Sequence, residues 1–236
     1  MTAVAVRTIA TICARGGSKG LPRKNLRLFA GLPLIGHTIT QALKCLQVDG
    51  VYVSTDDSEI AAVARDFGAT VPFLRPAALA QDDAPKLPAI EHLLRHLEAQ
   101  GHTIDRILDL QPTSPLRLPQ DLTGALGLDP AADLVVSVCE PSHNPYYTLV
   151  EQSGEGHLQL SKSATFVRRQ DAPPVWGLNG SIYVWQRLAL AQANAKGFWT
   201  VGAKPYLMPR ERSVDIDDAF DFELAEWLAL RGHIAK

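Results

Sequence analysis

Apolar and polar positions alternate along the first two-thirds of the chain in a pattern that predicts strands and helices in turn. Short apolar runs between turn residues indicate buried strands, and apolar residues three or four positions apart indicate amphipathic helices. Strands separated by helices are typical of an α/β fold with a mostly parallel sheet sandwiched by helices. We expect strands at Val4–Cys13, Val51–Thr55, Arg106–Leu110, Leu134–Val138 and Leu178–Trp185, and helices at Pro33–Gln47, from Asp57 or Ser58 to Gly68, around Leu87–Leu97, near Gln120–Leu128 and around Phe220–Leu228.

The pattern weakens between residues 141 and 176, where turn residues and short β-like pieces prevail. We interpret this stretch as a small lobe inserted into one domain that spans residues 1–236, and as the expected contact of a homodimer. A chain of 236 residues with 46% hydrophobic residues is long and apolar enough for one large domain with a sizeable core.

Charge and cysteine content narrow the class of function. The formal net charge of −2 argues against a nucleic-acid binder, which usually carries a broad basic face. Cys13, Cys45 and Cys139 lack metal-site spacing and indicate free thiols in a reducing compartment. No apolar run approaches the length that crosses a membrane. The sequence therefore predicts a soluble, cytoplasmic protein with no nucleic-acid or membrane partner.

The segment Ala14–Asn25, which reads ARGGSKGLPRKN, carries the most informative chemistry. It follows the first predicted strand and lies in a region, Met1 to Val48, that contains no Asp or Glu. Its glycines permit tight turns and close approach of a ligand. Cations on a strand-to-helix loop describe a site for an anion, above all a polyphosphate, and Arg15 and Lys19 would neutralise charge on a leaving pyrophosphate. The alternative is a solvated basic turn. The loop matches neither the P-loop nor the dinucleotide fingerprint.

A second constellation is Ser213–Asp217, which reads SVDID. If this segment is extended, Asp215 and Asp217 point to the same side and suit Mg²⁺, a hard cation that prefers oxygen ligands. The alternative is that these acids cap the last helix, with Asp217 or Asp218 at its N-cap. This segment alone supports the metal site and the helix cap equally, and the presence of the phosphate-type loop favours the metal site.

Two further segments carry candidate binding residues. Gln111–Arg117, reading QPTSPLR, follows a predicted central strand, and ligands of open α/β sheets lie beyond the carboxyl ends of strands. Gln111 offers a donor and an acceptor there, although an ordinary proline-rich loop would look similar. Arg168 and Arg169 could bind an acidic substrate through their guanidinium forks; a surface ion-pairing role is the alternative.

Taken in order, these segments resemble those of the acylneuraminate cytidylyltransferases, which make CMP-activated nonulosonic acids such as CMP-sialic acid. The resemblance covers nearly the full length and runs through ARGGSKGLPRKN, GLPLIGHTI, VSTDDSEIA, FLRP, LQPTSPLR, SVCE, RRQDAP, NGSIYV and SVDID. It implies a nucleotide-diphospho-sugar-transferase fold, a homodimer with a small swapped lobe, and dependence on Mg²⁺. The implied reaction is attack by the anomeric C2 hydroxyl of a nine-carbon α-keto acid on the α-phosphate of CTP, with release of pyrophosphate.

The resemblance also assigns residues to roles. Arg15, Ser18 and Lys19 match the triphosphate-binding loop, Lys24 and Asn25 match positions that hold the nucleotide, and Arg75 is expected near the cytosine. For the sugar acid it implies Gln111, Tyr147, Arg169 and Asn179. For Mg²⁺ it implies Asp215 and Asp217, the former bridged by water, and it makes Arg15, Lys19 and Asp217 the catalytic set.

Two departures lie in the half of the site that would hold the sugar. Sialate-activating members are expected to carry a lysine where this chain has Tyr147 and an arginine where it has Gly177. The segments HNPYYTLVE and RRQDAP resemble members that activate legionaminic acid, whose C9 methyl group tolerates the lost charge. This is a hypothesis about the substrate. A cytidylyltransferase for the eight-carbon sugar Kdo, and a catalytically silent nucleotide-binding module, are the alternative functions.

Overall fold

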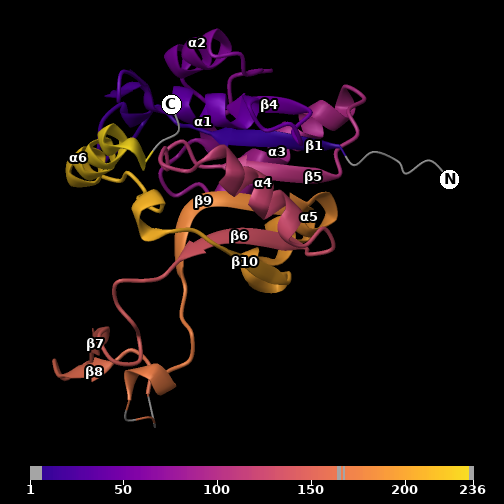
Figure 1. Ribbon diagram of the computed structural model, residues 1–236. Helices are drawn as coiled ribbons and strands as arrows, with labels where there is room; N and C mark the ends of the chain where they lie inside the picture. Colours follow the sequence, from indigo (N-terminus) through magenta and orange to yellow (C-terminus); the bar gives the residue numbers. More distant parts are fainter. Residues whose placement is uncertain (1–6, 164–165, 167, 234–236) are drawn as a thin grey trace.

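A six-stranded sheet forms the centre of the protein. The computed structural model describes residues 7–163, 166 and 168–233, and the first part of the predicted strand Val4–Cys13 lies outside them. Along the sheet the strands follow the order β10-β6-β9-β5-β1-β4, and only β9 runs antiparallel to its neighbours (Figure 1). The strands are β1 (Thr8–Cys13), β4 (Gly50–Ser54), β5 (Arg106–Leu110), β6 (Leu134–Cys139), β9 (Gly177–Gln186) and β10 (Ala203–Leu207).

Helices cover both faces of this sheet, because successive side chains of each strand point to opposite sides. On β1, Ala10 and Ile12 join a core with α1, α2 and α4, whereas Ile9 joins a second core with α3 and α5. The helices are α1 (Leu34–Leu43), α2 (Ser58–Asp66), α3 (Lys86–Ala99), α4 (Pro119–Leu128), α5 (Arg187–Lys196) and α6 (Ala219–Leu228). The predicted fold class, a mostly parallel α/β sheet between helices, is confirmed.

Local signals in the sequence account for several boundaries. Asp57 caps α2, because its carboxylate accepts hydrogen bonds from the backbone N–H groups of Glu59 (2.8 Å) and Ile60 (3.1 Å). Gly68 ends the same region with φ +93°, a left-handed conformation that glycine adopts freely. Asp218 caps α6 in the same way as Asp57 caps α2.

The structure corrects the expectation that the phosphate-type loop leads directly into a helix. A short 3-10 helix (Lys24–Leu26) and a hairpin of β2 (Leu28–Phe29) and β3 (Leu32–Pro33) separate the loop from α1. The hairpin returns the chain to the start of α1, where the backbone N–H of Leu34 donates to the carbonyl of Arg27 (2.9 Å). The N-terminus of α1 therefore does not follow the loop as the sequence suggested.

Residues 141–176 leave the sheet after β6 and return to it at β9. Their regular part is a small hairpin of β7 (Val150–Gln152) and β8 (Leu158–Leu160), which stands well away from the sheet in Figure 1. We call this segment the arm. Many of its large apolar side chains are exposed, among them Leu149, Val150, Leu158, Leu160 and Trp176.

The last helix buries a different face from the one that its bulky residues suggested. Phe220 and Trp227 are exposed, while Phe222 and Ala225 pack with the β2–β3 hairpin and Ile216 in a third core. Within the described residues, no helix combines the length and apolar character that a membrane crossing requires.

Candidate nucleotide site

A cavity of about 390 Å³ lies at the carboxyl ends of β1 and β5. In a parallel sheet these ends meet at one edge, and the loops that follow them are free to bind ligands. Segments far apart in the sequence converge here. The lining contains nine residues that the sequence assigned to the nucleotide, the sugar or the metal, namely Arg15, Ser18, Lys19, Lys24, Asn25, Arg75, Gln111, Asp215 and Asp217.

The glycines of the first loop allow close packing. A tight turn does form at Gly17, where the backbone N–H of Ser18 donates to the carbonyl oxygen of Gly16 (3.1 Å). None of Gly16, Gly17 and Gly20 has a positive φ, and the left-handed residue of the loop is Arg23, at φ 55°. A Cβ added to Gly16 would lie 2.6 Å from the carboxylate of Asp57, whereas one added to Gly17 would meet open space. Close approach to neighbouring groups, rather than backbone freedom, therefore explains Gly16.

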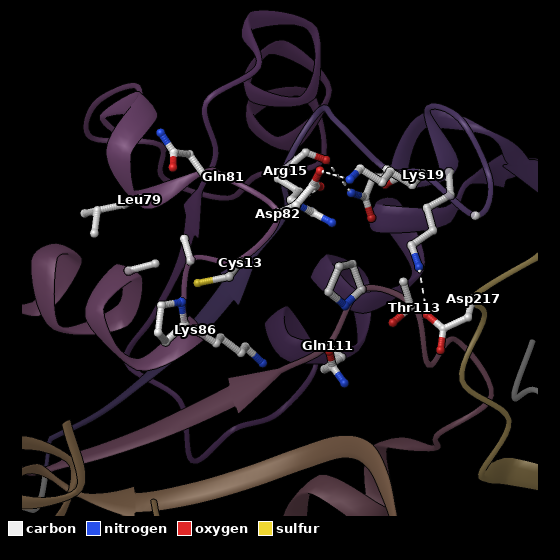
Figure 2. A pocket seen from close by; sticks show the side chains of 18 of the residues that line it. Cys13, Arg15, Lys19, Leu79, Gln81, Asp82, Lys86, Gln111, Thr113 and Asp217 are labelled. Atoms are coloured by element: carbon white, nitrogen blue, oxygen red, sulfur yellow. Dashed lines mark hydrogen bonds and ion pairs between the residues drawn. The ribbon is translucent and has the colours of Figure 1, made fainter. Parts of the chain in front are cut away.

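The first loop and the acidic segment are in direct contact. A Cβ on Gly20 would overlap the backbone oxygen of Asp217. Lys24 Nζ donates to the carbonyl oxygen of Ile216 (2.7 Å) and lies 3.3 Å from Asp217 Oδ1. Folding thus brings a cationic loop and a pair of carboxylates, nearly 200 positions apart, into the lining of the same cavity. Lys19 of the loop and Asp217 of the acidic segment are both seen in Figure 2.

The two carboxylates differ in their surroundings. Asp217 is exposed, and its side chain faces the cavity beside Lys24. Asp215 is half-buried, and its Oδ1 is buried without a hydrogen-bond partner. Burial, and next the neighbouring charge of Asp217, raise the pKa of Asp215 above its ordinary value, although the hydrogen bond with Thr113 opposes this.

This pair fits a divalent cation. An unpartnered buried carboxylate oxygen beside a second carboxylate is an incomplete oxygen ligand set of the kind that Mg²⁺ completes with water and phosphate. Among the described residues, no cluster of three or more His, Cys, Asp or Glu side chains is placed to hold a metal. The N-cap of α6 is Asp218, so neither Asp215 nor Asp217 is required to cap this helix.

Hydrogen bonds of the buried Arg117 side chain hold the backbone of Gln111 in place. The guanidinium of Arg117, which is fully buried, donates to the carbonyl oxygen of Gln111 (2.7 Å), to that of Ser181 (2.7 Å) and to the side chain of Gln41. Burial lowers the pKa of Arg117 to about 9. Above this network, a Cβ on Gly180 would overlap the Gln111 amide and lie 3.1 Å from Asp215 Oδ2. The Gln111 side chain can thus occupy this position because residue 180 is glycine.

Asn25 and Arg75, which the sequence assigned to the nucleotide, are buried residues of the cavity lining. Asn25 is 3% exposed; its amide donates to the carbonyl of Arg15 (3.1 Å), while its Oδ1 has no partner. Arg75 is also buried and has an unpartnered Nε, with Nη2 3.6 Å from Asp56. A buried polar atom without a partner is costly, so these two atoms are suited to a ligand that supplies hydrogen bonds.

Three of the residues assigned to the sugar lie outside the cavity. Tyr147 is in the arm, as is Arg169, which begins a short 3-10 helix (Arg169–Asp171) and whose side chain is outside the described part. Asn179 is 4% exposed, and its amide is engaged within the protein by Ser137, Ser181 and Ser213. These bonds tie β9 to β6 and to the segment that leads to Asp215, and a direct contact of Asn179 with the sugar stays a prediction.

Sequence reasoning missed several residues of the cavity. Asp82 forms ion pairs with Arg15 and Lys19, and Lys86 pairs with the buried Asp109 (2.6 Å). The sequence around Asp82 gives no local signal of these ion pairs. Asp109 stands within the strand RILDL, where an acid among apolar residues was a usable signal of a buried partner.

A mostly parallel α/β sheet, with a cationic loop facing a carboxylate pair at the strand ends, defines a nucleotide-binding protein of the α/β class. The family described as Cytidylyltransferase matches residues 9–127. The CMP-N,N'-diacetyllegionaminic acid synthase of Legionella pneumophila is 37% identical over 94% of this chain and 96% of its own. The chain therefore belongs to the cytidylyltransferase family and is a nucleotidyltransferase.

Two other similarities extend this result. N-acylneuraminate cytidylyltransferase A of Danio rerio is 38% identical over 96% of this chain, which corresponds to 52% of that protein. A CMP:2-keto-3-deoxy-manno-octonic acid synthetase solved with CTP superposes with a TM-score of 0.71, covering 95% of this chain and 99% of its own, at 19% identity. This second similarity shows the shared fold.

Proposed function

We propose that this enzyme transfers CMP from CTP to the anomeric hydroxyl of a nine-carbon α-keto acid sugar and releases pyrophosphate. One observation carries the proposal: the residues assigned to the triphosphate, the nucleoside and the metal, together with Gln111 of those assigned to the sugar, converge from separate segments on one cavity. Relatives named CMP-N,N'-diacetyllegionaminic acid synthase and N-acylneuraminate cytidylyltransferase, which align with nearly all of this chain, support the substrate class.

In the reaction, the C2 hydroxyl oxygen bonds to the α-phosphorus of CTP. The bond from that phosphorus to the bridging oxygen breaks, pyrophosphate leaves with its electron pair, and the hydroxyl proton is lost. Positioning and charge neutralisation carry most of such a transfer. Arg15 and Lys19 neutralise the growing charge on pyrophosphate, and Asn25 and Arg75 hold the nucleoside. Gln111 orients the sugar.

We assign the metal role to Asp215 and Asp217, with Mg²⁺ as the cation. The buried, unpartnered Oδ1 of Asp215 supports this assignment. When bound, Mg²⁺ would neutralise phosphate charge, and the two carboxylates would fix its position.

For the sugar we favour N,N′-diacetyllegionaminic acid over N-acetylneuraminic acid. Tyr147 and Gly177 stand where sialate-activating members are expected to carry cations, and a less polar substrate tolerates both changes. The name of the Legionella relative agrees with this choice.

We further propose a homodimer in which the arm of one subunit reaches the cavity of the other. The arm carries Tyr147 and Arg169, stands away from its own sheet in Figure 1, and exposes large apolar side chains that a second copy would cover.

Free cysteines support a cytoplasmic location, where thiols stay reduced.

Pyrophosphate release tests the activity. The purified protein should release pyrophosphate from CTP and Mg²⁺ with N,N′-diacetyllegionaminate, and more slowly with N-acetylneuraminate. Equal or faster turnover of the neuraminate would refute the choice of sugar, and activity only with Kdo would support the eight-carbon alternative. No release with any sugar acid would favour a silent nucleotide-binding module.

Subunit mixing tests the arm. Asp217→Ala inactivates the cavity, and Arg169→Ala inactivates the arm. If each arm serves the other subunit, a mixed dimer contains one intact site and recovers activity. If each arm serves its own subunit, the mixture stays inactive and the shared site is excluded.

A further inference from the structure

The two cations assigned to the triphosphate already hold an anion that belongs to the protein. Asp82 Oδ1 lies 2.5 Å from Arg15 Nη1, and Asp82 Oδ2 lies 2.5 Å from Lys19 Nζ. In Figure 2 the Asp82 carboxylate stands with Arg15 and Lys19, apart from Asp217. A carboxylate that presents one oxygen to each of two cations makes the contacts that a phosphate group would make there.

The surroundings of Asp82 allow it to move. It lies on the loop between a short 3-10 helix (Ala77–Leu79) and α3, and Gln81, Ala84 and Pro85 of this loop also line the cavity. Its side chain is 44% exposed, and that of Lys19 is 77% exposed. Ion pairs as exposed as these contribute little to stability, so they can break and re-form readily.

Asp82 is an anion under ordinary conditions. Hydrogen bonds from Lys19 and then from Arg15 lower the pKa of its carboxyl group. Two like charges cannot share the same pair of cations without repulsion. A triphosphate that binds Arg15 and Lys19 must therefore displace the Asp82 carboxylate.

We propose that Asp82 is an exchangeable internal anion: it neutralises Arg15 and Lys19 in the empty enzyme, yields them to the triphosphate of CTP, and takes them back as pyrophosphate leaves. This inference rests on the proposed function, because it assumes that these cations bind phosphates. Competition by Asp82 weakens the binding of substrate and product alike, and it speeds the release of pyrophosphate.

The test compares charge variants at residue 82. Asp82→Asn and Asp82→Ala remove the competing charge, and Asp82→Glu keeps it. Asp83→Asn is the matched control, because Asp83 is the next residue, is exposed, and forms no ion pair within the described part of the chain. Calorimetry measures the dissociation constants of inorganic tripolyphosphate and of CTP. Steady-state kinetics measures kcat, the KM for CTP and inhibition by pyrophosphate.

The expected result is binding roughly three- to tenfold tighter by Asp82→Asn and Asp82→Ala, as loss of two exposed ion pairs would give. Pyrophosphate should inhibit both variants more strongly, and kcat should fall together with KM. Asp82→Glu and Asp83→Asn should bind within twofold of the wild type. A role in holding the loop alone would not tighten binding in both neutral variants.

Two outcomes overturn the inference, and they are distinguishable. If the wild type binds CTP and the neutral variants bind it equally or more weakly, the exchange is wrong while the proposed function stands. If the wild type binds neither CTP nor tripolyphosphate, the proposed function fails and the exchange fails with it.

Discussion

Replacing Asp215 by asparagine should stabilise the metal-free protein while it abolishes activity. Asp215 is half-buried, and its Oδ1 is buried without a hydrogen-bond partner. Asparagine has nearly the same shape and no charge. The substitution therefore removes a carboxylate that the fold tolerates poorly, and with it the ligand that Mg²⁺ needs.

The size of the effect follows from opposing contributions. An unsatisfied buried polar group costs about 1–3 kcal/mol, more when charged. The substituted asparagine would retain an amide at the same place and would lose the attraction of Lys24 and Lys86, both of which favour the charged form of Asp215. The free energy of unfolding should therefore rise by about 1 kcal/mol, which corresponds to a rise of roughly 2–4 °C in Tm for a protein of this size.

The pH dependence of folding independently predicts the sign of the change in stability caused by Asp215→Asn. The pKa of Asp215 is raised in the folded state, so the folded protein binds the proton more tightly than the unfolded chain does. The stability that this group contributes is present below its unfolded pKa and is lost as the pH rises through the raised value. The advantage of Asp215→Asn should therefore be full at neutral pH and should vanish toward about pH 4.

Thermal melts followed by circular dichroism in EDTA, at several pH values, measure the difference. Asp217→Asn is the control, because the Asp217 side chain is exposed and its removal should change Tm little. A lower Tm for Asp215→Asn at neutral pH would refute the reasoning, since it would mean that the carboxylate is well compensated without metal.

Three further predictions follow from single positions. Asp217→Ala should abolish pyrophosphate release with an unchanged melt, because its side chain is exposed; retained turnover would contradict the metal role. Gly20→Ala should destabilise the protein by about 1–3 kcal/mol and weaken CTP binding, because the new Cβ overlaps Asp217, whereas Gly17→Ala meets open space and should do neither. Burial lowers the pKa of His37 from its ordinary value of 6.5, because the folded protein favours the neutral imidazole. The contribution of His37 to stability is therefore fully present above pH 6.5 and is lost as the pH falls below it. Denaturant titrations at pH 7 and pH 5 should show that His37→Gln reduces this loss; an unchanged loss would contradict it.

Most of the sheet could be predicted from the sequence, because its strands are short apolar runs with clear ends. The strand Arg106–Leu110 lies at its predicted bounds, and Leu134–Cys139 differs by one residue. β10 (Ala203–Leu207) was missed, because it is an edge strand with exposed side chains and a proline. α5 (Arg187–Lys196) was missed as well, since its buried face consists of two alanines and only one large apolar residue, Leu190.

The residues of the site could be predicted where a local sequence motif indicates a ligand or a metal. Arg15, Lys19, Asp215 and Asp217 line one cavity, although their roles stay predictions. Contacts across the fold left no such local signal: Asp82 against Arg15, and Gly180 beneath Gln111, depend on how distant segments pack. The exposure of Phe220 and Trp227 has the same origin, because the hairpin that covers α6 contacts its Phe222 side.

A crystal structure with CTP and Mg²⁺ tests the central claim most directly. The account predicts the triphosphate against Arg15 and Lys19, with the metal held by Asp215 and Asp217 in the same cavity. Nucleotide bound elsewhere, or metal bound away from both carboxylates, would contradict it.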